Sequence, residues 1–145
     1  MNWNDLRLAW EPRMLSILRI VVGLIYLQYG LNKVFNFPAT DNHPPYQLFT
    51  LVPGLAGLLE LIGGALLAVG LFTRPVAFIL SGEMAFAYFM VYAQRSFFPL
   101  VSGGNGAILY CFTFLYFFVV GAGAWSLDRL WASRSSTGVA AGRRA

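Results

Sequence analysis

Four long apolar runs dominate the chain and predict four helices. The runs cover residues 14–35, 55–72, 76–94 and 107–123. A helix rises about 1.5 Å per residue, so roughly 17 to 25 apolar residues cross the hydrocarbon core of a membrane. Each run has such a length, and none has the polar face that would cover it in a soluble helical protein. The pattern therefore predicts an all-α membrane protein, a bundle of four transmembrane helices.

Residues typical of turns separate the apolar runs. The sequence Phe-Thr-Arg-Pro at 72–75 divides the second run from the third, and a segment rich in glycine at 96–106 divides the third from the fourth. Glycine and proline favour turns because they interrupt regular helix. We expect a turn at Gly103, Gly104 and Asn105, where the fourth helix begins.

Polar residues in the first run recur at helical spacing. Arg19, Gly23, Tyr26, Gly30 and Lys33 are separated by 4, 3, 4 and 3 residues, so they share one face of a helix. Glycines on such a face allow a second helix to approach closely. The longer polar side chains between them can then reach that helix.

Further polar positions fall around this face. Gln28 and Asn32 are four residues apart and are displaced around the first helix, and Gly57, Glu60 and Gly64 share a face of the second helix. The two glycines beside Glu60 predict that another helix comes close enough to contact its carboxylate.

The charges inside the runs are expected to pair with one another. A single charge at the centre of a membrane helix costs roughly 2.5 to 3.5 kcal/mol on insertion scales, and such residues usually pair inside the bundle. Helices one and three run outward and helix two runs inward, which places Glu60 in the outer half and Glu83 in the inner half. The expected partners are Lys33, Asn32 or Gln28 for Glu60, and Arg19 for Glu83.

These polar residues allow two interpretations. They form a functional pocket, as a proton path or a site for a polar head group, or they only hold the helices together. The candidate pocket residues are Glu60, Glu83, Arg19, Lys33, Tyr26, Asn32 and Gln28.

Composition and charge agree with a membrane protein. The chain of 145 residues is 58% hydrophobic and 11% charged, whereas soluble domains carry about 25% charged residues. The net charge of +4 comes without a basic patch, so we predict no nucleic-acid partner. Seven of the ten basic residues lie before the first run, between runs two and three, or after run four. Because basic residues favour the cytoplasmic side, both termini are predicted to be cytoplasmic.

The two ends of the chain are expected to lie outside the membrane core. Residues 1–12 carry an apolar stripe of Trp3, Leu6 and Trp10, which is typical of an interfacial amphipathic segment or an aromatic belt. Pro12 is expected to separate this segment from a membrane domain over 13–128. After the fourth run, Ser126 is placed to cap a short helix, and residues 129–145 are predicted to form a basic, disordered tail.

Four stretches of the chain resemble one known family. They read "LRIVVGLIYLQYGLNKVFNFP", "GLLELIGGALLAVGLFTRPVAFILSGEMAFAYF", "FFPLVSGGNGAILYCFTFLYF" and "WSLD". In this order they are similar to the DoxX family of small four-helix membrane proteins. The resemblance implies a multi-pass protein of the bacterial inner membrane. Some relatives are named as subunits of thiosulfate:quinone oxidoreductases or belong to membrane redox complexes.

The resemblance extends to particular residues. It implies roles for Arg19, Lys33, Glu60 and Glu83 and for the turn at Gly103. The chain departs from the family at two positions. Tyr29 stands where members often have histidine, and Asn105 stands where they often have glutamate after the glycine pair, which weakens a proton-coupled mechanism taken over from relatives.

The chain carries no residues for a redox cofactor or metal of its own. His43 is the only histidine and Cys111 the only cysteine, so a bis-histidine haem, a dithiol or an iron–sulfur set is excluded. Electron transfer would therefore need a diffusible quinone or a redox partner subunit. Aromatic residues of the third and fourth runs could provide flat walls for a quinone ring, or they could simply face lipid or fill the bundle.

Two functions are compatible with these features. The first is a DoxX-type subunit of a quinone-linked membrane oxidoreductase, enzymatic only as an accessory. The second is a non-enzymatic membrane module that binds a lipid, a small hydrophobic molecule or a partner protein. A transporter is disfavoured because no inverted repeat or broken helix is evident. The sequence leaves the oligomeric state open.

Overall fold

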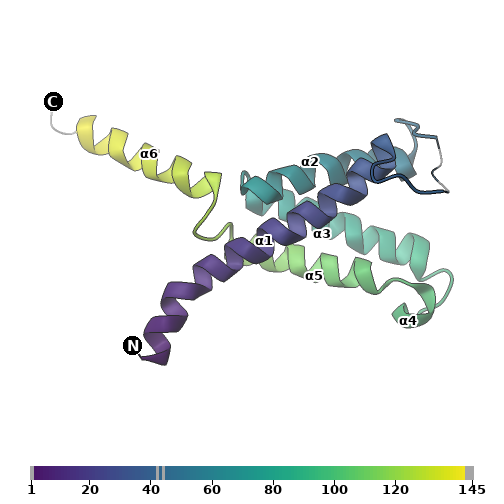
Figure 1. Cartoon of the computed structure of the whole chain (residues 1–145), viewed down its shortest axis with the longest axis horizontal. Helices are drawn as coiled ribbons and strands as arrows, with labels where there is room; N and C mark the ends of the chain where they lie inside the picture. The colour runs from purple at the N-terminus through teal and green to yellow at the C-terminus, as the bar shows by residue number, and fades with distance from the viewer. Residues whose placement is uncertain (1, 42, 44, 143–145) are drawn as a thin grey trace.

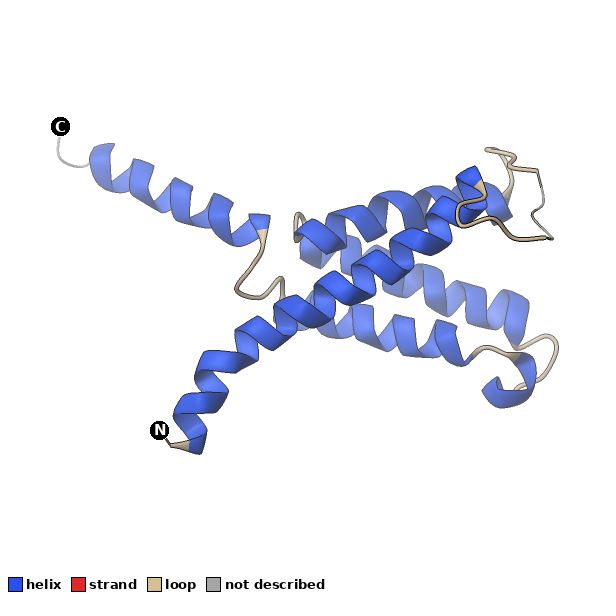
Figure 2. Cartoon of the chain, viewed as in Figure 1, coloured by secondary structure: helices blue, strands red, loops and turns tan. Residues whose placement is uncertain are grey.

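The fold is known from a computed structural model, which describes residues 2–41, 43 and 45–142. All regular elements of this part of the chain are helical (Figures 1 and 2), which confirms the prediction of an all-α protein. In chain order the elements are α1 (Trp3–Phe35), η1 (Leu51–Leu55), α2 (Ala56–Val69), α3 (Thr73–Ala87), η2 (Tyr88–Tyr92), α4 (Pro99–Ser102), α5 (Asn105–Val120) and α6 (Leu127–Gly142).

Three helical stretches of the described residues are long and apolar enough to cross a membrane. They are Trp3–Phe35, Leu51–Val69 and Thr73–Tyr92. The fourth predicted span corresponds to α5, which is apolar but has only 16 residues. The structure therefore has three candidate spans and one shorter apolar helix.

The first helix is longer than the sequence predicted. We expected Pro12 to separate an interfacial segment from the first span, but α1 runs without interruption from Trp3 and contains Pro12. The early start has a local cause, because Asn2 and Asp5 form a capping box at the first turn. The expectation of a break at Pro12 is therefore wrong. Figure 1 shows the N-terminal part of α1 leading away from the other helices.

The chain after α5 also forms a helix. Ser126 caps α6, since its Oγ accepts a hydrogen bond from the backbone N–H of Arg129 at 3.2 Å, as the sequence predicted. Residues 129–142 of the predicted tail continue α6, which projects from the packed helices in Figure 1. Residues 143–145 lie outside the described part of the chain.

The apolar helices pack as two pairs. Helix α1 packs most extensively against α2, and α3 packs against α5, while α2 also contacts α3. The pairs meet near the end from which α6 emerges, here named the α6 end. They diverge toward the opposite end, which carries α4 and is named the α4 end (Figure 1).

Glycines bring the backbones of α1 and α2 into contact. A Cβ atom added to Gly23 would lie 2.6 Å from the backbone nitrogen of Ala68, and one added to Gly64 would lie 2.5 Å from the backbone nitrogen of Leu27. A Cβ on Gly30 would likewise collide with the backbone of α2. The glycine face predicted from the spacing in the first run is therefore the contact surface between these helices.

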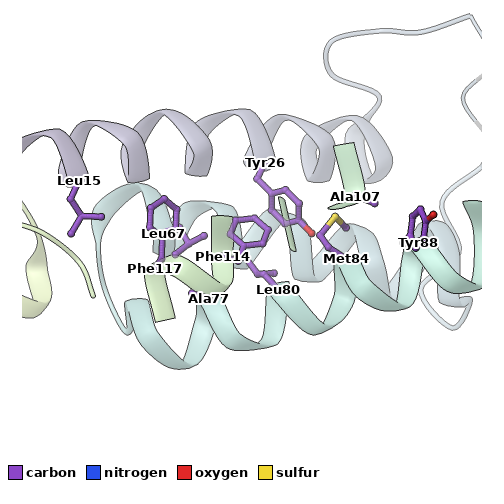
Figure 3. Packing of buried hydrophobic residues seen from close by; sticks show 10 residues of the cluster. All are labelled: Leu15, Tyr26, Leu67, Ala77, Leu80, Met84, Tyr88, Ala107, Phe114 and Phe117. Carbon is purple, nitrogen blue, oxygen red and sulfur yellow. The ribbon is translucent and has the colours of Figure 1, made fainter. Parts of the chain in front are cut away.

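Aromatic side chains connect the two pairs. The ring of Tyr26 on α1 lies 4.8 Å from that of Phe114 and 5.4 Å from that of Tyr110, both on α5. Figure 3 shows Tyr26 directed from α1 toward Phe114 and Met84. The buried apolar residues around this contact are Leu15, Leu67, Ala77, Leu80, Met84, Tyr88, Ala107, Phe114 and Phe117.

Replacing Gly64 tests the backbone contact of α1 and α2. We expect Gly64→Ala to lower the free energy of unfolding by about 1 to 3 kcal/mol, because the added methyl overpacks against backbone that cannot move aside. Gly82 on α3 provides the control, since a Cβ there meets no atom within 4 Å. Thermal unfolding of both variants in the same lipid or detergent measures the difference. An equal loss of stability in the two variants would contradict the contact.

Candidate functional site

A cavity of about 800 Å³ lies between the helix pairs, toward the α4 end. Its lining comes from both pairs and from η1 and η2. Most of the wall is apolar, with Leu55 and Leu59 from α2 and its preceding turn, and Ile79, Phe86 and Met90 from α3 and η2. The position follows from the divergence of the pairs at this end.

Four of the polar side chains that line the cavity are candidate residues predicted from the sequence. Tyr26 and Lys33 come from α1, Glu60 from α2 and Glu83 from α3. We refer to these four residues as the polar cluster. Tyr26 and Lys33 are seven residues apart, so they lie on the same face of α1, two turns from each other.

The first contact of the polar cluster is a salt bridge. Lys33 Nζ lies 2.6 Å from Glu60 Oε1, with 28% of the lysine side chain and 5% of the glutamate side chain exposed. Gly57 makes room for it, because a Cβ there would lie 3.2 Å from the Cβ of Lys33. The predicted contact between Glu60 and Lys33 is therefore present.

The other two expected partners of Glu60 lie elsewhere. Asn32 Nδ2 donates a hydrogen bond of 2.8 Å to the carbonyl oxygen of Pro38, so Asn32 ties the following loop to the end of α1. Gln28 is exposed on α1. Neither residue lines the cavity.

The second contact of the polar cluster joins α1 to α3. The hydroxyl of Tyr26 donates a hydrogen bond of 3.0 Å to Glu83 Oε2. Tyr26 is only 1% exposed, because its ring is enclosed by the aromatic contacts to α5. The partner of Glu83 is thus Tyr26, and the prediction that Glu83 faces Arg19 is wrong.

Each carboxylate of the polar cluster has one oxygen without a partner. Glu60 Oε2 and Glu83 Oε1 are buried and accept no hydrogen bond from any described residue. Burying a polar atom without a hydrogen bond costs free energy. The cluster therefore has two unsatisfied acceptors beside the cavity.

Arg19 lies at the α6 end and is fully buried. Its guanidinium donates hydrogen bonds to backbone carbonyl oxygens alone, those of Leu67, Ala68, Ala122 and Trp125. The first two belong to the last turn of α2, where the helix dipole favours a cation. Gly70 leaves space for this contact, since a Cβ there would lie 2.8 Å from the guanidinium carbon.

Helix ends explain why the prediction for Arg19 failed. Arg19 lies near the start of α3 at Thr73, because it binds the last turn of α2 and the carbonyl oxygen of Trp125, three residues before Asp128, which binds the first amides of α3. Glu83 is ten residues further along α3, about 15 Å away along the helix axis. Carbonyl groups, which the sequence does not mark, satisfy Arg19 instead of a carboxylate.

Asp128 is a structural residue that we did not predict. Its two carboxylate oxygens accept hydrogen bonds from the backbone N–H groups of Phe72 at 2.7 Å and Thr73 at 2.9 Å. It thereby caps α3 from the segment that follows α5. The available signal was the position of Asp128 in "WSLD", one of the stretches that resemble the DoxX family.

The glycine turn before α5 is present as predicted. Gly103 has a φ of +78°, a conformation that favours glycine. A Cβ on Gly104 would lie 2.8 Å from the ring of Tyr88. Gly103 lines the cavity, whereas Asn105 is exposed at the start of α5 and does not.

The structure thus brings together only part of the candidate set. Tyr26, Lys33, Glu60 and Glu83 meet at one cavity, while Arg19 lies at the other end of the same helix interface. That these residues form a functional site stays a prediction. Among the described residues, no three His, Cys, Asp or Glu side chains are grouped as ligands of a metal ion.

Comparison with known proteins places this helical membrane protein in a family. The sequence profile of the DoxX family matches residues 14–93. The chain therefore belongs to the DoxX family of membrane proteins, as the resemblance indicated.

Two relatives match over most of their length. An "Uncharacterized protein" of Haemophilus influenzae is 42% identical over 122 residues, which cover 82% of this chain and 91% of the relative. An "Uncharacterized membrane protein" of Mycobacterium tuberculosis is 24% identical over 150 aligned positions, covering 93% of this chain and 91% of the relative. No solved structure matches the chain.

Replacing Arg19 tests whether backbone carbonyls hold it. We expect Arg19→Met to lower the free energy of unfolding by about 3 kcal/mol, because several buried carbonyls lose their donor. Arg19→Lys should restore less than half of that loss, since an ammonium group cannot span the two segments as a guanidinium does.

The matched control for Arg19 lies on the same helix. Arg7 has an exposed side chain in a 4.0 Å salt bridge to Glu11, so Arg7→Met should change the unfolding free energy by less than about 1 kcal/mol. Thermal and denaturant unfolding in lipid nanodiscs measure all three variants. If Glu83→Arg restored the stability lost in Arg19→Glu, Arg19 would pair with Glu83 after all, and the assignment to backbone carbonyls would be wrong.

Proposed function

We propose that the cavity binds the ring of a quinone or quinol, and that the protein is a subunit of a quinone-linked membrane redox assembly with no redox cofactor of its own. The observation that carries this proposal is the combination of a cavity of about 800 Å³ with apolar walls and a single polar cluster. Small-molecule sites typically have this size range and this division between apolar walls and a few convergent polar groups.

The apolar walls suit a flat ring attached to an isoprenoid chain. Phe86, Tyr92 and Tyr110 contribute aromatic surface to the cavity. Tyr110 stacks on Phe114 at a ring distance of 5.7 Å and an interplanar angle of 22°, which holds its ring in place. Such fixed aromatic surfaces favour offset stacking with another ring.

The polar cluster suits the oxygen atoms of the ring. Lys33 can donate a hydrogen bond to a quinone carbonyl, and the carboxylates of Glu60 and Glu83 can accept one from a quinol hydroxyl. These groups lie beside the apolar wall, so a bound ring would be oriented with one oxygen toward them. Electrons would have to pass to or from a partner subunit, because the chain has one histidine and one cysteine.

The cavity can be reached from within a membrane. Leu55, Phe86 and Met90 line it and also have exposed fractions of 51%, 46% and 53%. Exposed apolar side chains of a transmembrane helix face lipid. A hydrophobic ligand could therefore enter sideways, without passing through water.

The proposed setting is the bacterial inner membrane. We propose that α5 crosses the membrane together with the three longer helices, so that four helices span it and both termini are cytoplasmic. The arginines in the N-terminal part of α1, at the start of α3 and after α5 support this orientation. In this orientation the cavity lies in the outer half of the membrane.

A binding measurement tests the proposal. Wild-type protein and Glu60→Gln are reconstituted in lipid nanodiscs, titrated with a short-chain ubiquinol and ubiquinone, and analysed for retained small molecules by mass spectrometry. We expect Glu60→Gln to weaken quinol binding at least tenfold, because an ion pair that frames the site is lost. Glu11→Gln, an exposed carboxylate near the α6 end, should leave the affinity unchanged.

A second variant separates the cavity from the polar cluster. Gly82 lines the cavity and has free space beside it, so Gly82→Trp should fill the cavity and abolish binding without unfolding the protein. Retention of ordinary phospholipid alone, unaffected by Glu60→Gln or Gly82→Trp, would refute the quinone proposal. Specific retention of one lipid, lost in Gly82→Trp, would instead support a non-enzymatic lipid-binding module.

A further inference from the structure

The polar cluster contains more acidic than basic groups. Seven titratable side chains line the cavity, and they are Tyr26, Tyr29, Lys33, Glu60, Glu83, Tyr92 and Tyr110. Lys33 is the only cation among them, whereas Glu60 and Glu83 are both carboxylates. With every carboxylate ionised, the cavity would carry a net charge of −1.

No other described cation compensates for this charge. Arg19 points to the α6 end, where backbone carbonyls bind it. Glu83 lines the same cavity as the salt bridge of Lys33 with Glu60, so the three charges share one largely apolar enclosure. An uncompensated charge in this setting is costly, because apolar helices and lipid surround it.

The hydrogen bonds of the cluster show the same imbalance. One oxygen of each carboxylate is occupied, by Lys33 on Glu60 at 2.6 Å and by Tyr26 on Glu83 at 3.0 Å. The remaining oxygens, Glu60 Oε2 and Glu83 Oε1, are buried acceptors for which no described residue supplies a donor. An ionised carboxylate can only accept, whereas a protonated one also has an O–H that donates.

We infer that Glu60 and Glu83 hold one proton between them, which makes the cavity a proton-binding site even when no ligand is present. A single proton brings the charge of the cluster to zero and turns one of the two unpartnered acceptors into an O–H donor. Two carboxyl groups that line one apolar cavity can avoid the repulsion of like charges by keeping one proton on the pair. The inference concerns the empty protein and does not depend on the proposed quinone.

The proton can exchange with water through Lys33. The lysine is the one cluster residue near the end of α1, and its side chain is 28% exposed, while the carboxylate that it binds is 5% exposed. Protons entering or leaving the cluster would therefore pass at the α4 end. A ligand hydroxyl in the cavity would meet one ionised carboxylate, which can accept a proton, and one carboxylic acid, which already holds one.

Infrared spectroscopy of ligand-free protein in nanodiscs tests this inference. We expect a C=O stretching band of a protonated, buried carboxylic acid at neutral pH, shifting on exchange into D₂O. The band should disappear in Glu83→Gln and also in Glu60→Gln, because the remaining carboxylate is then balanced by Lys33. It should grow about twofold in Lys33→Met, because both carboxyl groups are then neutral.

Two controls make the result decisive. Glu11→Gln removes an exposed carboxyl and should leave the band unchanged. Labelling the glutamates with ¹³C in the wild-type chain should shift the band, which assigns it to glutamate without a substitution that could disturb folding. A wild-type protein without the band, or a band that survives in both Glu83→Gln and Glu60→Gln, would overturn the inference.

The outcome is separable from that of the quinone experiment. If the band is present and quinol does not bind, the shared proton is supported and the quinone proposal is refuted. If quinol binds and the band is absent, the quinone proposal is supported and the shared proton is refuted.

Discussion

The contact of α1 with α2 is the constraint on which the other features depend. Gly23, Gly30 and Gly64 let the two backbones touch, and a membrane offers no hydrophobic effect that would hold the helices together otherwise. Close approach fixes the helices in both rotation and depth. As a result the two basic residues on the glycine face of α1 meet opposite ends of α2, and each finds a different kind of partner.

The two ends of this interface solve the problem of a buried charge in different ways. At the α6 end, Arg19 binds carbonyls that terminate α2 and carbonyls of the segment after α5, so it joins three parts of the chain. Asp128 then caps α3 from the same segment. At the α4 end, Lys33 binds the carboxylate of Glu60 beside an open cavity. At the α6 end, the guanidinium of Arg19 finds carbonyl acceptors, and the arrangement is structural. At the α4 end, one oxygen of Glu60 and one of Glu83 accept no hydrogen bond from any described residue.

Spacing in the sequence predicted the helix faces well and the partners less well. The four-three periodicity from Arg19 to Lys33 identified a face of α1 that contacts another helix, and depth in the membrane placed Lys33 among three possible partners of Glu60. Arg19 was assigned to Glu83 because only side-chain charges are visible in a sequence. A sequence does not show which backbone carbonyls lie at the end of a helix, yet several of them lie close together there and can accept hydrogen bonds from a buried cation. The start of α1 was misjudged as well, since the helix begins at Trp3 after a capping box of Asn2 and Asp5 and continues through Pro12.

The cavity itself could not be read from periodicity, because it arises from how two helix pairs are joined. Tyr26 packs against Phe114 and Tyr110, which fixes the distance between α1 and α5 at the middle of the molecule. Toward the α4 end the pairs diverge, and Lys33, two turns after Tyr26 on the same face of α1, lines the cavity. Tyr26 is thus both the last residue of the packed aromatic core and the first of the polar cluster. The ring of Tyr26 belongs to the aromatic core and its hydroxyl to the polar cluster. A shift in how the two helix pairs pack would therefore change the hydrogen bond to Glu83 directly. Any ligand or proton that alters Glu83 is therefore coupled, through a single side chain, to the packing of the whole molecule.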